Sequence, residues 1–427
     1  MKDPRNTIEN ITMITLKLLD YCRTNDWAGY DPYDALNSKL LSYLPFLNFR
    51  VFRIGLTQLL KRSPINIRPL LLIPKMQNPK ALALFLMAFL KLQKLGLLKD
   101  EDLIPSMVER LIALRSPLSL MNSSNSSNSI NSSNPSNSID SSNRHCCWGY
   151  SFPWQTRTIL VPRWSPNLVC MTFVANALMD AYETTGNSRC LDMAVGAARY
   201  ILDELYWIDA DGTACLAYPL QTSRARVHNA NFLGAALLCR VYKQTGDRKY
   251  LDPALNVARY SAAKQREDGS WDYGEDSTQR WIDNFHTGYN LCALDAICRY
   301  GETSEFEPHI RRGFKFYEQH FFEKDGAPKY FHNRIYPIDT HAVAQSLITL
   351  GTLRNRENGG AEQAESVFGW AIENMWDEEG FFYYQKYPAL TIKTPYMRWT
   401  QAWMLYALAS FLCYAENKEK SWTGSTG

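Results

Sequence analysis

Four acidic-glycine pairs recur in the second half of the chain, at Asp211-Gly212, Asp268-Gly269, Asp325-Gly326 and Glu379-Gly380. Their glycines are 57, 57 and 54 residues apart, and each interval holds two apolar patterns of helical period. A unit of that length is a helical hairpin plus a turn, which buries its apolar face only by stacking on neighbouring units. The chain is therefore predicted to be a helical repeat protein.

One helix of each predicted hairpin is rich in Ala, Leu and Cys nearly all round, which is typical of a helix buried on both sides. These inner helices begin near Pro166, Asn229, His286, His341 and Thr400, and the first four end near Gly186, Gly246, Gly301 and Gly351. Glycine is a common helix stop. The more charged, predicted outer helices cover Cys190 to Leu205, Tyr250 to Lys264, Glu305 to Phe321 and Ala361 to Met375.

Residues 1–118 are predicted to form an N-terminal helical part, the first hairpin plus a basic extension. Its helical patterns cover Thr7 to Arg23, Tyr33 to Lys61, Lys80 to Leu97 and Glu101 to Arg115, the third opened by Asn78-Pro79. Residues 119–143 are mostly Ser and Asn with scattered Ile and Pro, which predicts a disordered insertion outside the fold. Residues 144–420 are predicted to hold the hairpin repeats.

The two ends of this array each lack a partner. The last inner helix, Thr400 to Glu416, has no outer helix after it, and Thr7 to Arg23 has no inner helix before it. Pairing them closes the array and removes both exposed ends. We expect an all-α, (α/α)6 toroid of about six helical hairpins, closed by pairing of the N-terminal helix with the last hairpin.

Charge is distributed unevenly, although the net charge is only +3. No acidic residue occurs between Asp34 and Asp100, where eleven basic ones lie. This basic, Leu-rich stretch fits peripheral contact with anionic lipid through residues 35–99, or a diphosphate-bearing substrate, or packing against a more acidic repeat domain.

The ten cysteines show no metal-binding or disulfide spacing, which favours reduced, buried thiols. The longest uncharged apolar run in the first hundred residues, Ala81 to Leu90, is too short to span a bilayer, and no signal core precedes it. We expect a cytoplasmic protein, with a membrane-peripheral location as the alternative. No cofactor and no nucleic-acid partner is predicted.

Polar residues recur where the inner helices begin, which a ring would bring to one mouth. The catalytic candidates are Asp283 with His286, and Asp339 with His341. A carboxylate and an imidazole on one rim are the usual groups for acid-base chemistry near neutral pH. Each Asp is equally explained as a helix N-cap, and each His as a structural hydrogen-bond partner.

The other hypothesis for this rim is a metal ion held by histidines of successive repeats. No spacing such as HExxH supports it, so we predict no metal site. Because the acidic-glycine turns follow outer helices and lead into inner ones, they are also expected around the mouth.

The substrate-binding candidates are aromatic and polar residues of the same turns and helix starts. They are Trp148, Trp154, Gln155, Arg157, His228, Asn229, Trp271, Trp281, Arg398, Trp399 and Gln401. The densest cluster, Cys147 to Arg157, fits a platform for stacking against sugar rings, and equally a plug that seals a hairpin end.

The segment Gln265 to Trp271 resembles the QxxxGxW repeat of the terpene cyclases, whose double α-barrel relatives include the protein prenyltransferases. That motif has a structural role there, tying a helix end to a turn. Only one copy fits here, and the cyclases' acidic DxDD cluster is absent.

A closer resemblance covers nearly the whole chain. Gly29 to Leu36, Trp148 to Gln155 and Trp281 to Gly288 are similar to recurrent segments of an uncharacterised group of prokaryotic α/α-toroid proteins. That group is associated with exopolysaccharide and cell-surface glycan biosynthesis. The resemblance implies the toroid shared by many glycan-active hydrolases, lyases and epimerases.

We therefore expect a glycan-active toroid of cell-surface polysaccharide biosynthesis, with hydrolase, lyase or epimerase chemistry on an oligosaccharide or lipid-linked glycan. Two alternatives remain: a non-catalytic glycan-binding or scaffold protein, and an isoprenoid enzyme similar to the terpene cyclases and prenyltransferases. A cavity without a polar His-Asn-Gln lining would favour the last.

Overall fold

The computed structural model describes residues 4–117, 120, 145–354 and 360–423, so the predicted insertion at 119–143 lies outside the described residues except for Leu120. Within this part of the chain, six helices form a closed inner ring, in which each helix contacts the next and the last contacts the first. They are α4 (Pro79–Lys94), α7 (Leu168–Thr185), α9 (His228–Thr245), α11 (Asn284–Tyr300), α13 (Thr340–Leu353) and α15 (Trp403–Thr423). The predicted toroid is confirmed.

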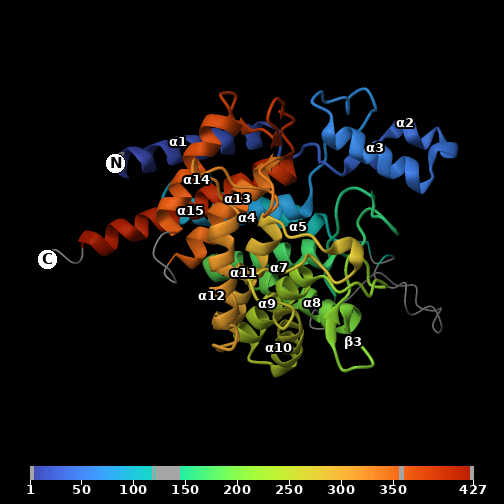
Figure 1. The fold of residues 1–427 in the computed structure, drawn as a ribbon, viewed down its shortest axis with the longest axis vertical. Coiled ribbons are helices and arrows are strands. Elements are labelled where there is room, and N and C mark those ends of the chain that lie inside the picture. The colour runs from blue at the N-terminus through green and yellow to red at the C-terminus, as the bar shows by residue number, and fades with distance from the viewer. Residues whose placement is uncertain (1–3, 118–119, 121–144, 355–359, 424–427) are drawn as a thin grey trace.

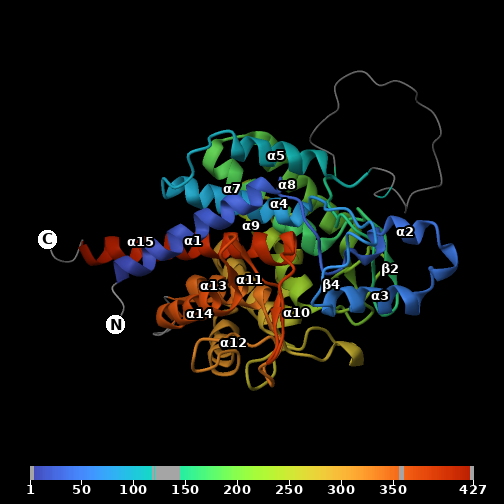
Figure 2. The ribbon, with the colours of Figure 1, turned by 90° about the horizontal axis from the view of Figure 1, so that it is seen from above.

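A second layer of helices surrounds this ring, each packed on the inner helix of its own hairpin (Figure 1). The outer helices are α1 (Pro4–Thr24), α5 (Leu103–Ala113), α8 (Ser188–Tyr200), α10 (Arg248–Ala262), α12 (Glu307–His320) and α14 (Gly360–Met375). Helix α1 lies along α15, as Figure 2 shows, so the two ends of the chain form one hairpin and close the ring. This is the predicted closure.

Local signals explain where the inner helices begin and end. The Asn167 side chain caps α7 by accepting the Cys170 N–H at 3.1 Å, and Asn78 caps α4 just before Pro79. Helices α7 and α9 end at Gly186 and Gly246, which have φ of 72° and 71°. Glycine adopts this left-handed conformation without steric cost. Because inner and outer helices alternate in direction, the inner helices all start at one end of the ring, which we call the mouth.

The connections that lead from outer to inner helices contain short antiparallel strands. β1 (Trp154–Gln155) pairs with β2 (Leu160–Val161), β3 (Tyr206–Ile208) with β4 (Ala214–Leu216), and β6 (Trp376–Asp377) with β7 (Phe381–Phe382). β8 (Gln385–Lys386) lies between β5 (Ile338–Asp339) and β9 (Thr391–Ile392). Single turns of other helix types occur at η4 (Ile201–Leu205), η5 (Ser277–Gln279) and η6 (Met397–Ala402).

Three of the four acidic-glycine turns pack against the outer layer, whereas the sequence analysis expected these turns around the mouth. A Cβ on Gly326 would lie 2.5 Å from the Ser366 carbonyl oxygen in α14, and one on Gly380 would lie 3.0 Å from that of Lys17 in α1. Gly269 meets the Arg312 carbonyl of α12 in the same way. Each of these turns therefore presses on the backbone of the next outer helix, where only glycine leaves room.

The predicted helix from Tyr33 to Lys61 is wrong, because this segment is broken into η1 (Asp34–Asn37), α2 (Lys39–Ser42), η2 (Pro45–Leu47) and α3 (Arg50–Arg62). The Ser38 side chain accepts the Leu41 N–H and starts a new helix, and a proline at 45 has no N–H with which to continue it. In Figures 1 and 2, α2 and α3 extend away from the ring. None of the described helices is both long and apolar enough to cross a bilayer.

Candidate functional site

Asp283 and His286 form a hydrogen-bonded pair at the start of α11. Asp283 caps the helix, with Oδ1 accepting the His286 backbone N–H at 2.9 Å, and its Oδ2 lies 2.7 Å from His286 Nδ1. Trp281 Nε1 donates to the same Oδ2 at 2.9 Å. A carboxylate only accepts, so Nδ1 carries a proton, and in the neutral form of the ring Nε2 has the lone pair. The side chain of Asp283 is 1% exposed and that of His286 is 20% exposed.

Aromatic rings hold the His286 imidazole in place. Tyr273 stacks on Trp281 with centroids 4.5 Å apart, and its ring lies 4.6 Å from the imidazole. Phe285 contacts the imidazole at 4.2 Å, and Tyr289 meets it edge-on at 5.9 Å. Among the described residues, none of the hydrogen bonds involves His286 Nε2, so this nitrogen is available to a ligand.

His341, the second residue of α13, is buried. Its Nε2 lies 2.5 Å from the Tyr289 hydroxyl, and its Nδ1 has no hydrogen-bond partner among the described residues. Burial, followed by the charges of Lys80 and Arg398, lowers the pKa of His341 well below its usual value. The imidazole is therefore neutral, and one of its two nitrogens remains unpaired.

Asp339 is fully engaged by protein donors. Oδ1 accepts the His341 N–H at 2.8 Å and Trp399 Nε1 at 2.9 Å, and Oδ2 accepts Gln385 Nε2 at 2.6 Å. Burial raises the pKa of Asp339 to about 6, although these donors oppose the shift. Asp339 therefore positions the start of α13 and the Trp399 ring, and it has no free oxygen to offer.

Lys80, which the sequence analysis missed, is buried at the start of α4. Its Nζ lies 4.1 Å from the ring centroid of Phe173, 5.1 Å from that of Trp403 and 5.4 Å from that of Tyr289. Burial, with a smaller effect from Arg398, lowers the pKa of Lys80 well below its usual value. Lys80 and His341 are each the second residue of an inner helix, and this shared position is the signal that could have identified Lys80.

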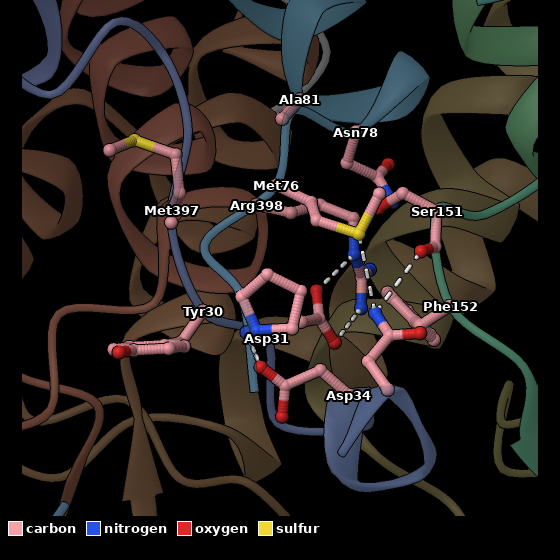
Figure 3. Close-up of a pocket in the computed structure, with 13 residues that line it drawn as sticks. Tyr30, Asp31, Asp34, Met76, Asn78, Ala81, Ser151, Phe152, Met397 and Arg398 are labelled. Carbon is pink, nitrogen blue, oxygen red and sulfur yellow. Dashed lines mark hydrogen bonds and ion pairs between the residues drawn. The ribbon is translucent and has the colours of Figure 1, made fainter. Parts of the chain in front are cut away.

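Arg398 and Asp31 form a buried bidentate ion pair beside the mouth. Arg398 Nε donates to Oδ2 at 2.6 Å and Nη2 donates to Oδ1 at 2.8 Å. Figure 3 shows the two side chains meeting beside a pocket. The pocket has a volume of about 10 Å³, room for about one water. The guanidinium also lies 5.0 Å from the Tyr150 ring centroid and 5.3 Å from that of Trp399.

The segment Gly29 to Leu36 thus reaches the mouth through side chains that the sequence analysis did not single out. Arg68 Nε donates to Asp34 Oδ1 at 2.7 Å, and burial raises the pKa of Asp34 to about 6 despite this contact. Tyr33 accepts a hydrogen bond from Lys61 at 2.9 Å and packs edge-on against Trp399.

Three predicted binding residues lie in the packed interior instead. Trp148 Nε1 donates to the Leu111 carbonyl at 2.7 Å, and Trp271 Nε1 donates to that of Ser261 at 3.0 Å. The Gln401 amide bonds both backbone groups of Phe382. These contacts fix the connecting segments of the toroid to α5, α10 and η6.

His228 also points to the outer layer. Its Nδ1 lies 3.4 Å from the Ser261 hydroxyl of α10, and burial lowers its pKa to about 4. It therefore does not converge with His286 and His341. In the described part of the chain, no group of three or more His, Cys, Asp or Glu is arranged to hold a metal ion. Asn229 is buried, and its Oδ1 has no partner there.

Of the remaining candidates, Gln155 contacts α3 and Arg157 contacts η5. Gln155 Oε1 accepts Arg53 Nε of α3 at 2.8 Å, and the exposed Arg157 donates to the Thr278 carbonyl at 3.2 Å. Trp154 is half-buried in β1. The structure therefore gathers Asp283, His286, Trp281, Asp339, His341, Arg398 and Trp399. Asn229, like Lys80 and His341, is the second residue of an inner helix.

Gln265, in the segment that resembles a QxxxGxW repeat, ties one hairpin to the next. Its Nε2 donates to the Gly269 carbonyl at 2.9 Å and to that of His309 in α12 at 3.0 Å. This is the structural role that the resemblance implied.

Comparison with known proteins finds the same fold in solved structures. Cellobiose 2-epimerase from Bacillus thermoamylovorans superposes with a TM-score of 0.58 at 11% identity, covering 80% of this chain and 89% of that one. Unsaturated glucuronyl hydrolase from Streptococcus agalactiae gives 0.57 at 12% identity and covers 96% of both chains. A GH76 α-mannanase from Bacteroides thetaiotaomicron gives 0.56 at 12%, covering 80% and 87%.

The chain is an α/α toroid of this six-hairpin type. Likeness at 11–12% identity shows the fold alone. No protein-family model and no curated protein matches the sequence.

Proposed function

We propose that this toroid is a glycan-active enzyme that removes and returns a carbon-bound proton of an oligosaccharide, the reaction class of sugar epimerases. His286 Nε2 is the general base, and Asp283 holds the ring and stabilises the imidazolium that forms. The observation that carries the proposal is the 2.7 Å contact between Asp283 Oδ2 and His286 Nδ1, with Nε2 left free beside the aromatic mouth.

The engagement of the carboxylates favours imidazole chemistry over two-carboxylate hydrolysis. Glycoside hydrolysis usually needs an acid and a base carboxyl group facing the scissile bond. Asp283 and Asp339 are held by protein donors, and Asp31 is paired with Arg398. A lyase would begin with the same proton abstraction, but would expel a leaving group instead of returning the proton.

Unpaired polar atoms on the inner helices support a polar ligand over an isoprenoid. Asn290 Oδ1, Gln345 Oε1 and His341 Nδ1 are buried without a hydrogen-bond partner among the described residues. Each such atom costs about 1–3 kcal/mol unless a ligand or solvent pairs with it. A cavity for an apolar chain would gain nothing from them.

Aromatic rings and earlier resemblances support the substrate class. Trp281 stacks on Tyr273, and Trp399 meets His341 edge-to-face, and such aromatic side chains suit stacking against sugar rings. Solved structures of the same fold include a cellobiose 2-epimerase and an unsaturated glucuronyl hydrolase. Together with the resemblance to toroids of glycan biosynthesis, this supports a role in cell-surface polysaccharide synthesis.

Single substitutions of the pair test the proposal against a panel of neutral and acidic oligosaccharides. We expect His286→Asn to lower kcat/KM by at least about 10²-fold, with binding by calorimetry changed only a few-fold. Asp283→Asn should show a similar loss, because it favours the wrong tautomer of His286.

The matched control is His320→Asn in outer helix α12, which should retain full activity. Full activity in both His286→Asn and Asp283→Asn would exclude the proposed roles. A wild-type protein that binds oligosaccharides without changing any of them would instead be a glycan-binding protein.

A further inference from the structure

Exposed apolar side chains are concentrated in the segment between the first helix and the ring. We call residues 38–75 the arm. It carries most of the large hydrophobic side chains that are exposed in the described part of the chain: Leu40, Tyr43, Leu44, Phe46, Phe49, Val51, Leu59, Ile65, Leu70 and Leu72. The exposed fractions of Tyr43, Phe46 and Leu70 are 79%, 72% and 77%. Large exposed apolar surfaces on soluble proteins mark sites of interaction with another protein or with a membrane.

The arm is a folded element, so this exposure is not that of a loose chain. Leu60 and Ile73 pack with Ala35 in a small core of their own. Below it, Arg68 is buried and bonded to Asp34, and the Ser38 hydroxyl donates to the Leu71 carbonyl at 2.7 Å. The arm therefore holds its apolar side chains outward on a fixed framework.

Charge decides which partner suits this surface. No acidic residue occurs between Asp34 and Asp100, and Arg50, Arg62 and Lys75 are exposed on the arm. Apolar side chains mixed with cations, and without anions, complement the headgroups and acyl boundary of an anionic bilayer. An apolar protein partner would not require the absence of acidic residues.

An apolar groove lies beside the exposed side chains of the arm. It has a volume of about 270 Å³ and is lined mainly by leucines and by Phe52 of α3, with Arg53 among its lining residues. Leu36, which lines this groove, is three residues from Tyr33, which packs against Trp399 at the mouth. The arm and the mouth are thus neighbouring surfaces of the molecule.

We propose that the arm is a membrane-docking surface that binds an anionic lipid bilayer, with its apolar side chains in the acyl boundary and its arginines at the headgroups. Docking in this way places the mouth beside the membrane surface. The proposal goes beyond the proposed function, because docking requires no catalysis.

Vesicle sedimentation with the full chain tests this surface. We expect binding to phosphatidylcholine vesicles that contain phosphatidylglycerol, weakening at high salt, and little binding to phosphatidylcholine alone. The pair Arg50→Glu/Arg62→Glu should weaken binding at least about ten-fold, and Phe46→Ser/Phe49→Ser should do the same. Both should keep the thermal midpoint and the activity of the wild type on a soluble substrate.

The matched control is Ile208→Ser/Leu390→Ser, which removes exposed apolar side chains elsewhere and should bind vesicles as the wild type does. The proposal is overturned by absence of binding, by equal binding to both vesicle types, or by binding that the arm variants leave unchanged. It is also overturned if light scattering shows a dimer that the arm variants dissociate, since a second copy of the chain would then cover the patch.

Discussion

Lys80 is buried near the mouth, and its contacts compensate only weakly for the cost of burying its charge. Three aromatic rings surround its amine, and no ion pair of the described residues includes it. A cation over aromatic faces gains about 0.5–2 kcal/mol, which is less than the usual cost of burying an ammonium group. The lowered pKa of Lys80 expresses this imbalance, and such imbalances occur often at functional sites.

We expect Lys80→Met to stabilise the fold, because methionine fills a similar volume without a charge. Because the pKa of folded Lys80 lies below its unfolded value of 10.5, the unfolded state binds the extra proton between these two values. Stability therefore rises with pH across that window, and the substitution should add about 1–3 kcal/mol at pH 7 and progressively less as pH approaches 10.5. Urea unfolding at several pH values measures this.

Lys91→Met, on the same helix and only half-buried, is the control and should change stability little at any pH. If Lys80→Met were clearly less stable than the wild type at pH 7, the aromatic contacts would outweigh the burial cost and this account of Lys80 would be wrong.

Sequence spacing predicted that Asp283 and His286 lie together, as they do, because a carboxylate three residues before an imidazole shares its helix end. It could not identify Tyr289 or Lys80, because a tyrosine in an apolar helix is usually a packed core residue and a lysine there usually lies at the surface. Only the ring, which sets α4 opposite α11, brings Lys80 against Tyr289. For the same reason Trp148 and Trp271 were assigned to binding, although their indole N–H groups donate to carbonyls of the outer helices α5 and α10.

At the scale of the elements, three of the four acidic-glycine turns pack one hairpin against the outer helix of the next. Gly326 has a φ of 92° and presses on the Ser366 carbonyl of α14. Gly212 has a similar φ of 82°, but no atom lies within 4 Å of where its Cβ would be. The two glycines share the backbone requirement and differ only in the contact.

We therefore expect Gly326→Ala to destabilise the protein by about 1–3 kcal/mol more than Gly212→Ala does, since both pay for left-handed backbone but only the first overpacks. Differential scanning calorimetry of the two variants measures the difference. Equal losses of stability would show that the close approach of Gly326 to α14 contributes nothing.

Helix positions followed well from the sequence because each hairpin repeats the same apolar period, and α7 and α9 end at the predicted glycines. Gly351 is not a stop, because α13 continues through it to Leu353. The helices of the arm could not be located from the sequence, because its leucines and basic residues continue a helical pattern past Ser38. In the structure, Ser38 caps the start of a new helix. The location of the turns was also missed, because periodicity orders the helices along the chain but does not say which layer a turn contacts.

At the scale of the whole molecule, the ring closes where the chain ends meet. Helix α1 pairs with α15, and the buried pair of Asp31 and Arg398 joins the N-terminal segment to η6 across 367 residues of sequence. This contact lies beside the mouth, so the same ion pair closes the toroid and shapes the site. Closure was predictable from two unpartnered helices, but the ion pair was not, because nothing local links its two residues.

The proton transfer assigned to His286 is tested most directly by incubation with oligosaccharide in D₂O, followed by NMR of the recovered sugar. The predicted result is deuterium on one sugar carbon with the wild-type protein, and none with His286→Asn. Cleavage of a glycosidic bond without deuterium on any carbon would contradict the assignment and would indicate that the protein is a hydrolase.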